Sequence, residues 1–221
     1  MARNKYPEVT VEKILEVSQR LFLEKGYDNT TIQDIVNELG GLTKGAIYHH
    51  FKSKEDIMDA LGDKLFFENN PFEEVRRRTD LNGLQKLREV VLLNQKNEPL
   101  MQLNRQALPI LKNPRILVGM LDSDRRFLSP CFQELLEEGN RDGSIHTAYA
   151  KELAEILPIL SDVWLAPTVC PATAAEMKKK FAFLADLLDK MGVPLVDEEI
   201  KTMAEAFFQE IAQDQAAREQ G

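Results

Sequence analysis

Residues 39–54 concentrate side chains that can bind a polyanion. This stretch carries Lys44, Lys52 and Lys54, two of the three histidines of the chain, and neither Asp nor Glu. The whole chain is acidic, with a net charge of −8, so the local positive charge departs from the average. A phosphate backbone attracts such a concentration of positive charge. The stretch therefore predicts a nucleic-acid-binding element.

Enzyme chemistry and metal chemistry find less support in the sequence. His49 and His50 are adjacent, so on a helix they point to different faces and do not share a metal. Cys131 and Cys170 lack the spacing of a metal or redox motif. No P-loop, dinucleotide fingerprint, zinc motif or nucleophile elbow is present, and His146 is the one remaining histidine for acid–base work. We expect no enzymatic activity, no cofactor and no metal.

Composition places the chain among folded proteins. Its 221 residues are 43% hydrophobic and 29% charged, which is too apolar for a disordered chain. The apolar runs are far shorter than the ~20 residues of a membrane span. The N-terminus has no apolar segment of the kind found in secretory signals. We expect a cytoplasmic protein that contacts no membrane.

Three short helices are expected over residues 10–51, where they would position the basic stretch. The first begins near Thr10 and ends at Gly26. The second has two overlapping N-cap choices, Thr30 with Gln33 or Thr31 with Asp34. Gly40-Gly41 ends it, and Thr43 can cap a third helix after this tight turn. Two short helices joined in this way are typical of a helix-turn-helix. Ser53 and Asp56 then open a longer fourth helix.

The rest of the chain has helical periodicity in longer segments. Asn113-Pro114 supplies an N-cap followed by a proline at the first helical position, and it opens a long helix that ends near Gly139. We expect kinks at Pro130 and Pro158, because proline cannot donate the hydrogen bond of an interior helical position. No run predicts a strand, so the expected fold is all-α. The remaining expected helices span about residues 81–97, 100–111, 149–165, 174–191 and 197–213.

The strings TTIQDIV and GLTKGAIYHHFKSKEDIMDAL resemble the DNA-binding domain of the TetR (tetracycline repressor) family. The detailed resemblance covers about residues 10–61, and the turn LGGLTKG is one residue longer than the usual family form. The resemblance implies a helix-turn-helix DNA-binding domain over residues 1–53 and a larger helical effector-binding and dimerisation domain over residues 54–221.

The predicted DNA contacts combine this resemblance with the chemistry of the residues. The resemblance places Thr43, Lys44, Tyr48 and His49 at or near DNA, and it gives Lys54 a phosphate. Thr31, at the start of the second helix, can hydrogen-bond a phosphate beside the free N–H groups there. Gly45 leaves space where the backbone approaches the duplex. These residues form the expected nucleic-acid interface.

The resemblance also implies partners for the C-terminal domain. It predicts a homodimer through helices 149–165 and 174–191, a palindromic operator in double-stranded DNA, and a small-molecule effector that relieves repression. Helical spacing suggests a mainly apolar pocket and hence a lipophilic effector. The candidate pocket residues are Leu65, Met101, Met120, Phe127 and Trp164.

Two other classes of function stay open at this point. A DNA-binding architectural protein would share the N-terminal domain but would have a closed C-terminal core, whereas a sensor needs a cavity of ~300–1,000 Å³. An all-helical enzyme is the third class, and the missing catalytic motifs speak against it.

Overall fold

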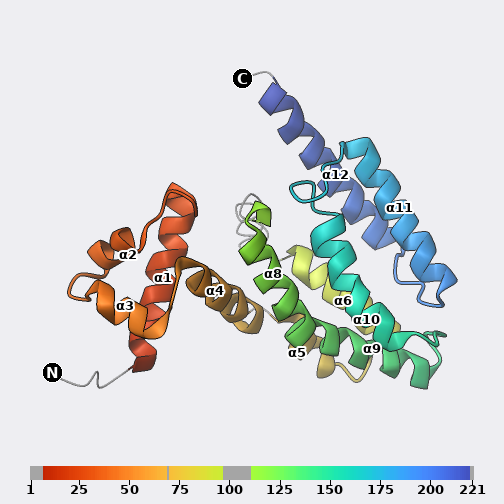
Figure 1. The fold of residues 1–221 in the computed structure, drawn as a ribbon. Helices are drawn as coiled ribbons and strands as arrows, with labels where there is room; N and C mark the ends of the chain where they lie inside the picture. Colours follow the sequence, from red (N-terminus) through yellow and green to blue (C-terminus); the bar gives the residue numbers. More distant parts are fainter. Residues whose placement is uncertain (1–6, 69, 97–110, 220–221) are drawn as a thin grey trace. The chain divides into compact units, whose positions relative to one another are not determined.

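The computed structural model describes residues 7–68, 70–96 and 111–219, and the regular elements in these ranges are all helical (Figure 1). None of the helices in these ranges combines the length and the apolar character that a membrane span requires. The α-helices are α1 (Pro7–Lys25), α2 (Ile32–Leu39), α3 (Lys44–His50), α4 (Lys54–Glu68), α5 (Pro71–Arg76), α6 (Gly83–Lys96), α8 (Pro114–Ser123), α9 (Ser129–Asp142), α10 (Ala150–Pro158), α11 (Ala174–Lys190) and α12 (Glu198–Glu219).

The described residues divide into two compact units. The first unit comprises α1 to α4 together with residues 111–120, which include the N-terminal turns of α8. The second unit comprises residues 70–96 and 121–219. The predicted domain boundary after residue 53 divides the chain by function and stays a prediction.

The core of the first unit lies among its helices. Ile14, Ile35, Ile47 and Ile57 come from α1, α2, α3 and α4 in turn, and each is fully buried. Burying one such side chain stabilises the fold by roughly 1.5–3 kcal/mol. The short helices α2 and α3 are too short to persist alone, so this shared core holds them in place.

Local capping fixes where α2 begins. Of the two predicted choices, the structure selects Thr31 with Asp34, which form a reciprocal capping box. Thr30 is buried instead, and its hydroxyl donates to the carbonyl oxygens of Leu21 and Gly26. Gln33 bonds to Asn37 on the surface of α2. The buried bonds of Thr30 explain why it does not serve as the cap.

The N-terminal part of α8 belongs to the first unit. Ile116 is buried in the same core as α1 to α4. Gly119 lies so close to Asp59 of α4 that a Cβ atom would collide with that carboxylate. The Asp59 carboxylate therefore packs directly against the backbone of Gly119, where a glycine leaves room for it.

The second unit contains a close helix contact of its own. A Cβ atom on Gly83 of α6 would lie 2.8 Å from the carbonyl oxygen of Leu135 and would overlap the backbone of Gly139, both in α9. Asp142, at the end of α9, accepts a hydrogen bond from the N–H of Gly83 at 2.7 Å. The start of α6 is thus fixed against the end of α9.

Two π-helical segments interrupt helices that the sequence predicts as merely kinked. The predicted helix from Pro114 to Gly139 becomes α8, a π-helical segment η2 (Asp124–Leu128) and α9. The predicted helix 149–165 becomes α10 and a second π-helical segment, η3 (Ile159–Trp164). In η2 the N–H of Ser129 bonds to the carbonyl of Asp124, five residues back, directly before Pro130. Pro130 lacks the N–H that an α-helix would bond to the carbonyl of Arg126, and the wider turn lies directly before this break.

Two further differences concern helix boundaries. The short helix α5 is absent from the predicted elements, although Asn70 caps it and Pro71 follows, which is the same signal that opens α8. The predicted helix over residues 100–111 lies almost entirely outside the described residues. The last helix, α12, extends to Glu219, beyond the predicted end near residue 213.

Candidate nucleic-acid interface

The helix α3 is held by a cap at one end and by apolar side chains on one face. Thr43 is its N-cap, with its Oγ1 accepting from the N–H of Ala46 at 3.2 Å. Ile47 and Phe51 are buried in the core of the first unit. These interactions decide which face of α3 points outward.

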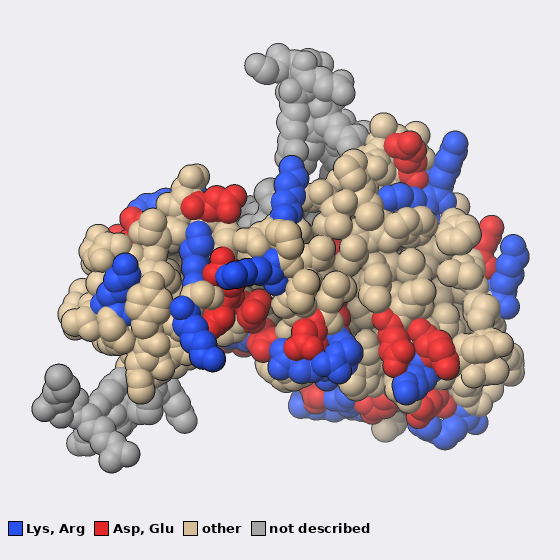
Figure 2. Space-filling model, viewed as in Figure 1, with Lys and Arg blue, Asp and Glu red and all other residues tan. Residues whose placement is uncertain are grey.

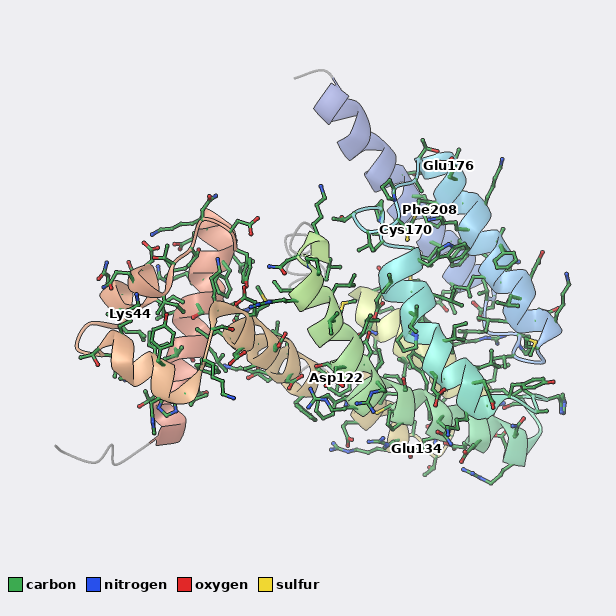
Figure 3. All side chains as sticks on the ribbon, viewed as in Figure 1. Lys44, Asp122, Glu134, Cys170, Glu176 and Phe208 are labelled. Atoms are coloured by element: carbon green, nitrogen blue, oxygen red, sulfur yellow. The ribbon has the colours of Figure 1, made fainter. Side chains whose placement is uncertain are left out.

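The outward face of α3 carries the predicted DNA-reading side chains. Thr43, Lys44 and His49 are exposed, and the Tyr48 side chain is 46% exposed. Lys44 projects from the N-terminal end of α3 (Figure 3), and its ammonium lies 6.0 Å from the centre of the Tyr48 ring. An exposed aromatic side chain beside an exposed lysine can contact base edges and phosphates together.

Gly45 leaves open space on α3. A Cβ atom there would meet only Thr43 Oγ1, at an ordinary contact distance of 3.8 Å. Glycine inside a helix costs about 1 kcal/mol relative to alanine, and nothing within the described fold requires it at this position. The absence of a side chain opens the start of α3 to close approach by a partner.

Thr31 is occupied in capping α2. Its Oγ1 accepts from the N–H of Asp34 at 3.1 Å, and its own N–H donates to Asp34 Oδ2 at 2.8 Å. The hydrogen bonds from the Thr31 side chain and backbone lower the pKa of Asp34 to about 2. Thr31 is exposed, so a phosphate contact stays a prediction for this residue.

The predicted phosphate ligand Lys54 is held inside the first unit. Its ammonium donates to the carbonyl oxygens of Tyr27, at 2.6 Å, and Thr30, at 2.9 Å. It also lies 4.1 Å from the centre of the Tyr27 ring. The structure thus gives Lys54 internal partners that the sequence did not indicate.

Several charged side chains elsewhere on the first unit form ion pairs. Arg20 bonds to Glu38 at 2.6 Å, and Lys25 bonds to Asp34 at 3.3 Å. Figure 2 shows acidic and basic side chains interspersed over much of the visible face. By contrast, residues 39–54 contribute positive charge without any acid of their own.

The predicted effector residues are distributed over both units. Leu65 and Met120 belong to the first unit and are half-buried, while Phe127 and Trp164 belong to the second and are also half-buried. Met101 lies outside the described residues. The guanidinium of Arg126 lies 4.9 Å from the Phe127 ring centre, and the ammonium of Lys180 lies 5.2 Å from that of Trp164. The pocket assignment stays a prediction.

The π-helical segments carry two carboxyl groups that sequence reasoning missed. Burial, and after it the neighbouring Asp162, raises the pKa of Asp124 in η2 to about 7. Burial raises the pKa of Asp162 in η3 to about 6, against a hydrogen bond from Ser161. Asp124 Oδ2 is buried without a hydrogen-bond partner among the described residues. Nothing in their sequence spacing pairs them, because the two segments are 30 or more residues apart along the chain.

Comparison with known proteins adds to this geometry. Residues 14–61 match the model of the family described as bacterial regulatory proteins, tetR family. The chain is 45% identical over 56 residues to the transcriptional regulator TtgR of Pseudomonas putida, which covers 25% of this chain and 26% of that protein. It is 29% identical over 151 residues to the transcriptional repressor KstR2 of Rhodococcus jostii, covering 64% of this chain and 71% of that protein. The chain thus spans only about a quarter of the length of the first of these relatives.

Solved structures share the fold along most of the chain. A TetR-family regulator from Pectobacterium atrosepticum superposes with a TM-score of 0.56 at 22% identity, covering 87% of this chain and 98% of that one. A transcriptional regulator from Saccharomonospora viridis, solved in complex with choline, gives 0.55 at 24% identity, covering 82% and 96%. These likenesses concern the all-helical architecture, and the relatives are regulators, not enzymes. The tetR-family match thus covers residues 14–61, and the chain as a whole shares the all-helical architecture of solved tetR-family regulators.

Proposed function

We propose that this protein is a transcriptional repressor that binds double-stranded DNA through α3. The observation that carries the proposal is the outward face of α3, where Lys44, Tyr48 and His49 are exposed while Ile47 is fully buried behind them. A helix of this size fits the major groove, which is ~12 Å wide. Thr43 and Gly45, at the start of α3, allow the backbone to approach the duplex, and Thr31 adds a phosphate contact from α2.

A single short helix reads only a few base pairs, so we infer that the protein acts as a symmetric dimer. Exposed large apolar side chains support an interface through helices 149–165 and 174–191: Tyr149, Ile156, Ile159 and Phe183 are 53%, 42%, 45% and 56% exposed. Trp164 of η3 packs edge-on against Phe183 of α11, with ring centres 5.8 Å apart. A twofold dimer matches a palindromic operator whose half-sites lie one helical turn, ~34–36 Å, apart.

We further propose that a small lipophilic molecule releases the protein from its operator. An effector shifts DNA binding only by as much as its affinity differs between the two states of the protein. The helix α8 belongs to both units, since its first turns pack in the core of the first unit and its last turn lies in the second. This continuity supports α8 as the element that carries the effect of the ligand.

Selection from a random pool of double-stranded DNA tests this proposal without knowledge of the natural operator. The purified protein should enrich a palindromic sequence, and sedimentation should show a dimer that binds one selected fragment. A stable dimer of this kind buries more than ~1,000 Å². Enrichment of no sequence, or a monomer at micromolar concentration, would contradict the proposed function.

A further inference from the structure

The side chain of Lys54 is anchored to the turn that joins α1 to α2. Its Nζ donates to the carbonyl oxygens of Tyr27 and Thr30, at 2.6 and 2.9 Å, and lies 4.1 Å from the centre of the Tyr27 ring. These three partners come from one short turn, and the Lys54 side chain is half-buried against them. The ammonium therefore satisfies at least two of its three donors without a phosphate.

The position of Lys54 in the sequence calls for such partners. It is the first residue of α4, where a cation meets the positive end of the helix dipole at a cost of roughly 0.3–1 kcal/mol. Two carbonyl oxygens and the face of an aromatic ring offset that cost. A bound phosphate would do the same, so the unfavourable placement alone does not distinguish the two roles.

The turn that Lys54 holds leads directly into α2. Thr30 is buried, and its hydroxyl donates to the carbonyl of Gly26 at 2.8 Å. The next residue, Thr31, is the N-cap of α2. Because α2 packs against α3, the contact between Lys54 and Thr30 connects α4 to the helix proposed to read DNA.

We propose that Lys54 is a positioning residue, which holds α2 and α3 in the DNA-binding geometry relative to α4 and does not act as a phosphate ligand. This inference rests on the proposed DNA-binding function. A displacement of α4 would reach the start of α2 through this side chain. The neighbouring residue, Glu55, interacts electrostatically with Arg115 of α8, so the first turn of α4 connects α8 with the turn between α1 and α2.

The two roles differ in how binding depends on salt. Loss of a phosphate contact lowers the slope of log K against log salt by about 0.9 and weakens binding to all DNA alike. Loss of a positioning contact misaligns the groups that read bases, so it weakens binding to the selected sequence alone and leaves the slope unchanged.

The test compares Lys54→Met with two matched lysine variants. Lys44→Met removes a charge from the outward face of α3, and Lys52→Met removes one from an exposed position two residues before Lys54. The probes are a fragment selected from a random pool by the wild-type protein and an unrelated fragment of equal length. Fluorescence anisotropy gives each affinity between about 50 and 200 mM salt.

For Lys54→Met, we expect about tenfold weaker binding to the selected fragment, which corresponds to ~1.4 kcal/mol. The salt slope should equal that of the wild type, and binding to the unrelated fragment should change by less than about twofold. Lys44→Met should lower the slope. The amide resonances of Thr31 and Asp34 should shift in Lys54→Met and stay in place in Lys52→Met, which reports the position of α2 directly.

Two results would overturn the inference: wild-type affinity in Lys54→Met, or a slope reduced by about 0.9 with equal weakening on both fragments. If Lys54→Met does not fold, Lys54→Arg distinguishes the two roles, because it keeps the positive charge but replaces the compact ammonium by a larger, planar guanidinium. A positioning role predicts a lower ratio of selected to unrelated binding for Lys54→Arg, and an unchanged ratio would refute it. Failure of the wild type to select any sequence would refute the proposed function instead.

Discussion

The two units of the molecule are specified in different ways. In the first unit, caps and turns within a few residues of each other fix α2 and α3, and buried side chains from four helices complete the arrangement. In the second unit, several contacts join distant residues, such as Gly83 with Gly139 and Lys86 with Glu138. The helices and turns of the first unit can therefore be predicted from local sequence signals, whereas those of the second unit depend on tertiary packing.

The largest expected effect on stability concerns a glycine in each unit. Gly83→Ala places a Cβ atom against the backbone of Gly139 and 2.8 Å from the Leu135 carbonyl, and backbone cannot move aside as a side chain can. We expect a loss of about 3 kcal/mol in the free energy of unfolding, measured by urea denaturation. Gly62→Ala, in α4, meets nothing within 4 Å and should gain about 0.5–1 kcal/mol. Equal effects of the two substitutions would contradict the close contact between α6 and α9.

A second prediction concerns the outward face of α3. Lys44→Ala and Tyr48→Ala should each weaken binding to a selected DNA fragment by about 1–3 kcal/mol, or roughly 5- to 150-fold. Lys201→Ala, at an exposed position of α12 in the second unit, should leave this affinity unchanged. The melting temperatures of all three variants should equal that of the wild type. If Lys201→Ala weakens binding as much as Lys44→Ala, DNA binding is not confined to the outward face of α3 as proposed.

A third prediction concerns pH and belongs to the second unit. The pKa of Asp124 rises from its ordinary value of 3.8 to about 7, mainly through burial. Between about pH 4 and 7 the folded state therefore binds more protons than the unfolded state, so stability falls as pH rises through that window. Asp124→Asn removes this penalty and should raise the melting temperature at about pH 8 by ~2–4 °C, or ~1 kcal/mol after allowance for solvent screening.

Asp122 provides the control for that measurement. It lies two residues earlier, is exposed, and has its pKa lowered by a hydrogen bond from Arg125. Asp122→Asn should not raise the melting temperature at any pH. Calorimetry gives the melting temperature of each variant as a function of pH. If both variants had the same pH dependence as the wild type, the burial of the Asp124 carboxylate would be contradicted.

The smallest expected effects come from the same motif placed in both units. Thr31 caps α2 with Asp34, and Thr173 caps α11 with Glu176, each as a reciprocal capping box. Replacing either threonine by alanine should cost about 1 kcal/mol of stability. Thr31→Ala should also weaken DNA binding, because α2 supports α3, whereas Thr173→Ala should not. Denaturation measures the effect of each variant on stability, and fluorescence anisotropy measures its effect on DNA affinity. Equal DNA affinities of the two variants would contradict the different roles of the two capping boxes.

The sequence predicts the first unit well because its signals are short-range. The turn before α3 is indicated by Gly40 and Gly41, which both adopt positive φ, at 47° and 105°. Thr43 indicates where α3 begins, because it can serve as an N-cap. Lys44 and Tyr48 are four residues apart and so share one face of α3, which is exposed, whereas Ile47 is buried. The competition between Thr30 and Thr31 was not decidable, because the buried carbonyls of Leu21 and Gly26 that accept from Thr30 come from another helix and turn.

The second unit shows what sequence spacing omits. Pro130 predicts a kink in its helix, but sequence spacing does not indicate the wider π-helical turn, Asp124–Leu128, that precedes it. The first unit has one such case, because the internal bonds of Lys54 join it to Tyr27 and Thr30, which lie 24 to 27 residues away. The predicted effector residues rest on helical spacing and on the family resemblance, and neither determines how one helix packs against another.

Protection of guanine N7 from methylation, on the selected DNA fragment, tests most directly whether α3 reads the major groove as one of a symmetric pair. The N7 atoms lie in the major groove. The wild-type protein should protect two clusters related by twofold symmetry, about 10–10.5 base pairs apart from centre to centre, and Tyr48→Ala should lose both. A single protected cluster, or affinity for the fragment without any N7 protection, would contradict the proposed interface.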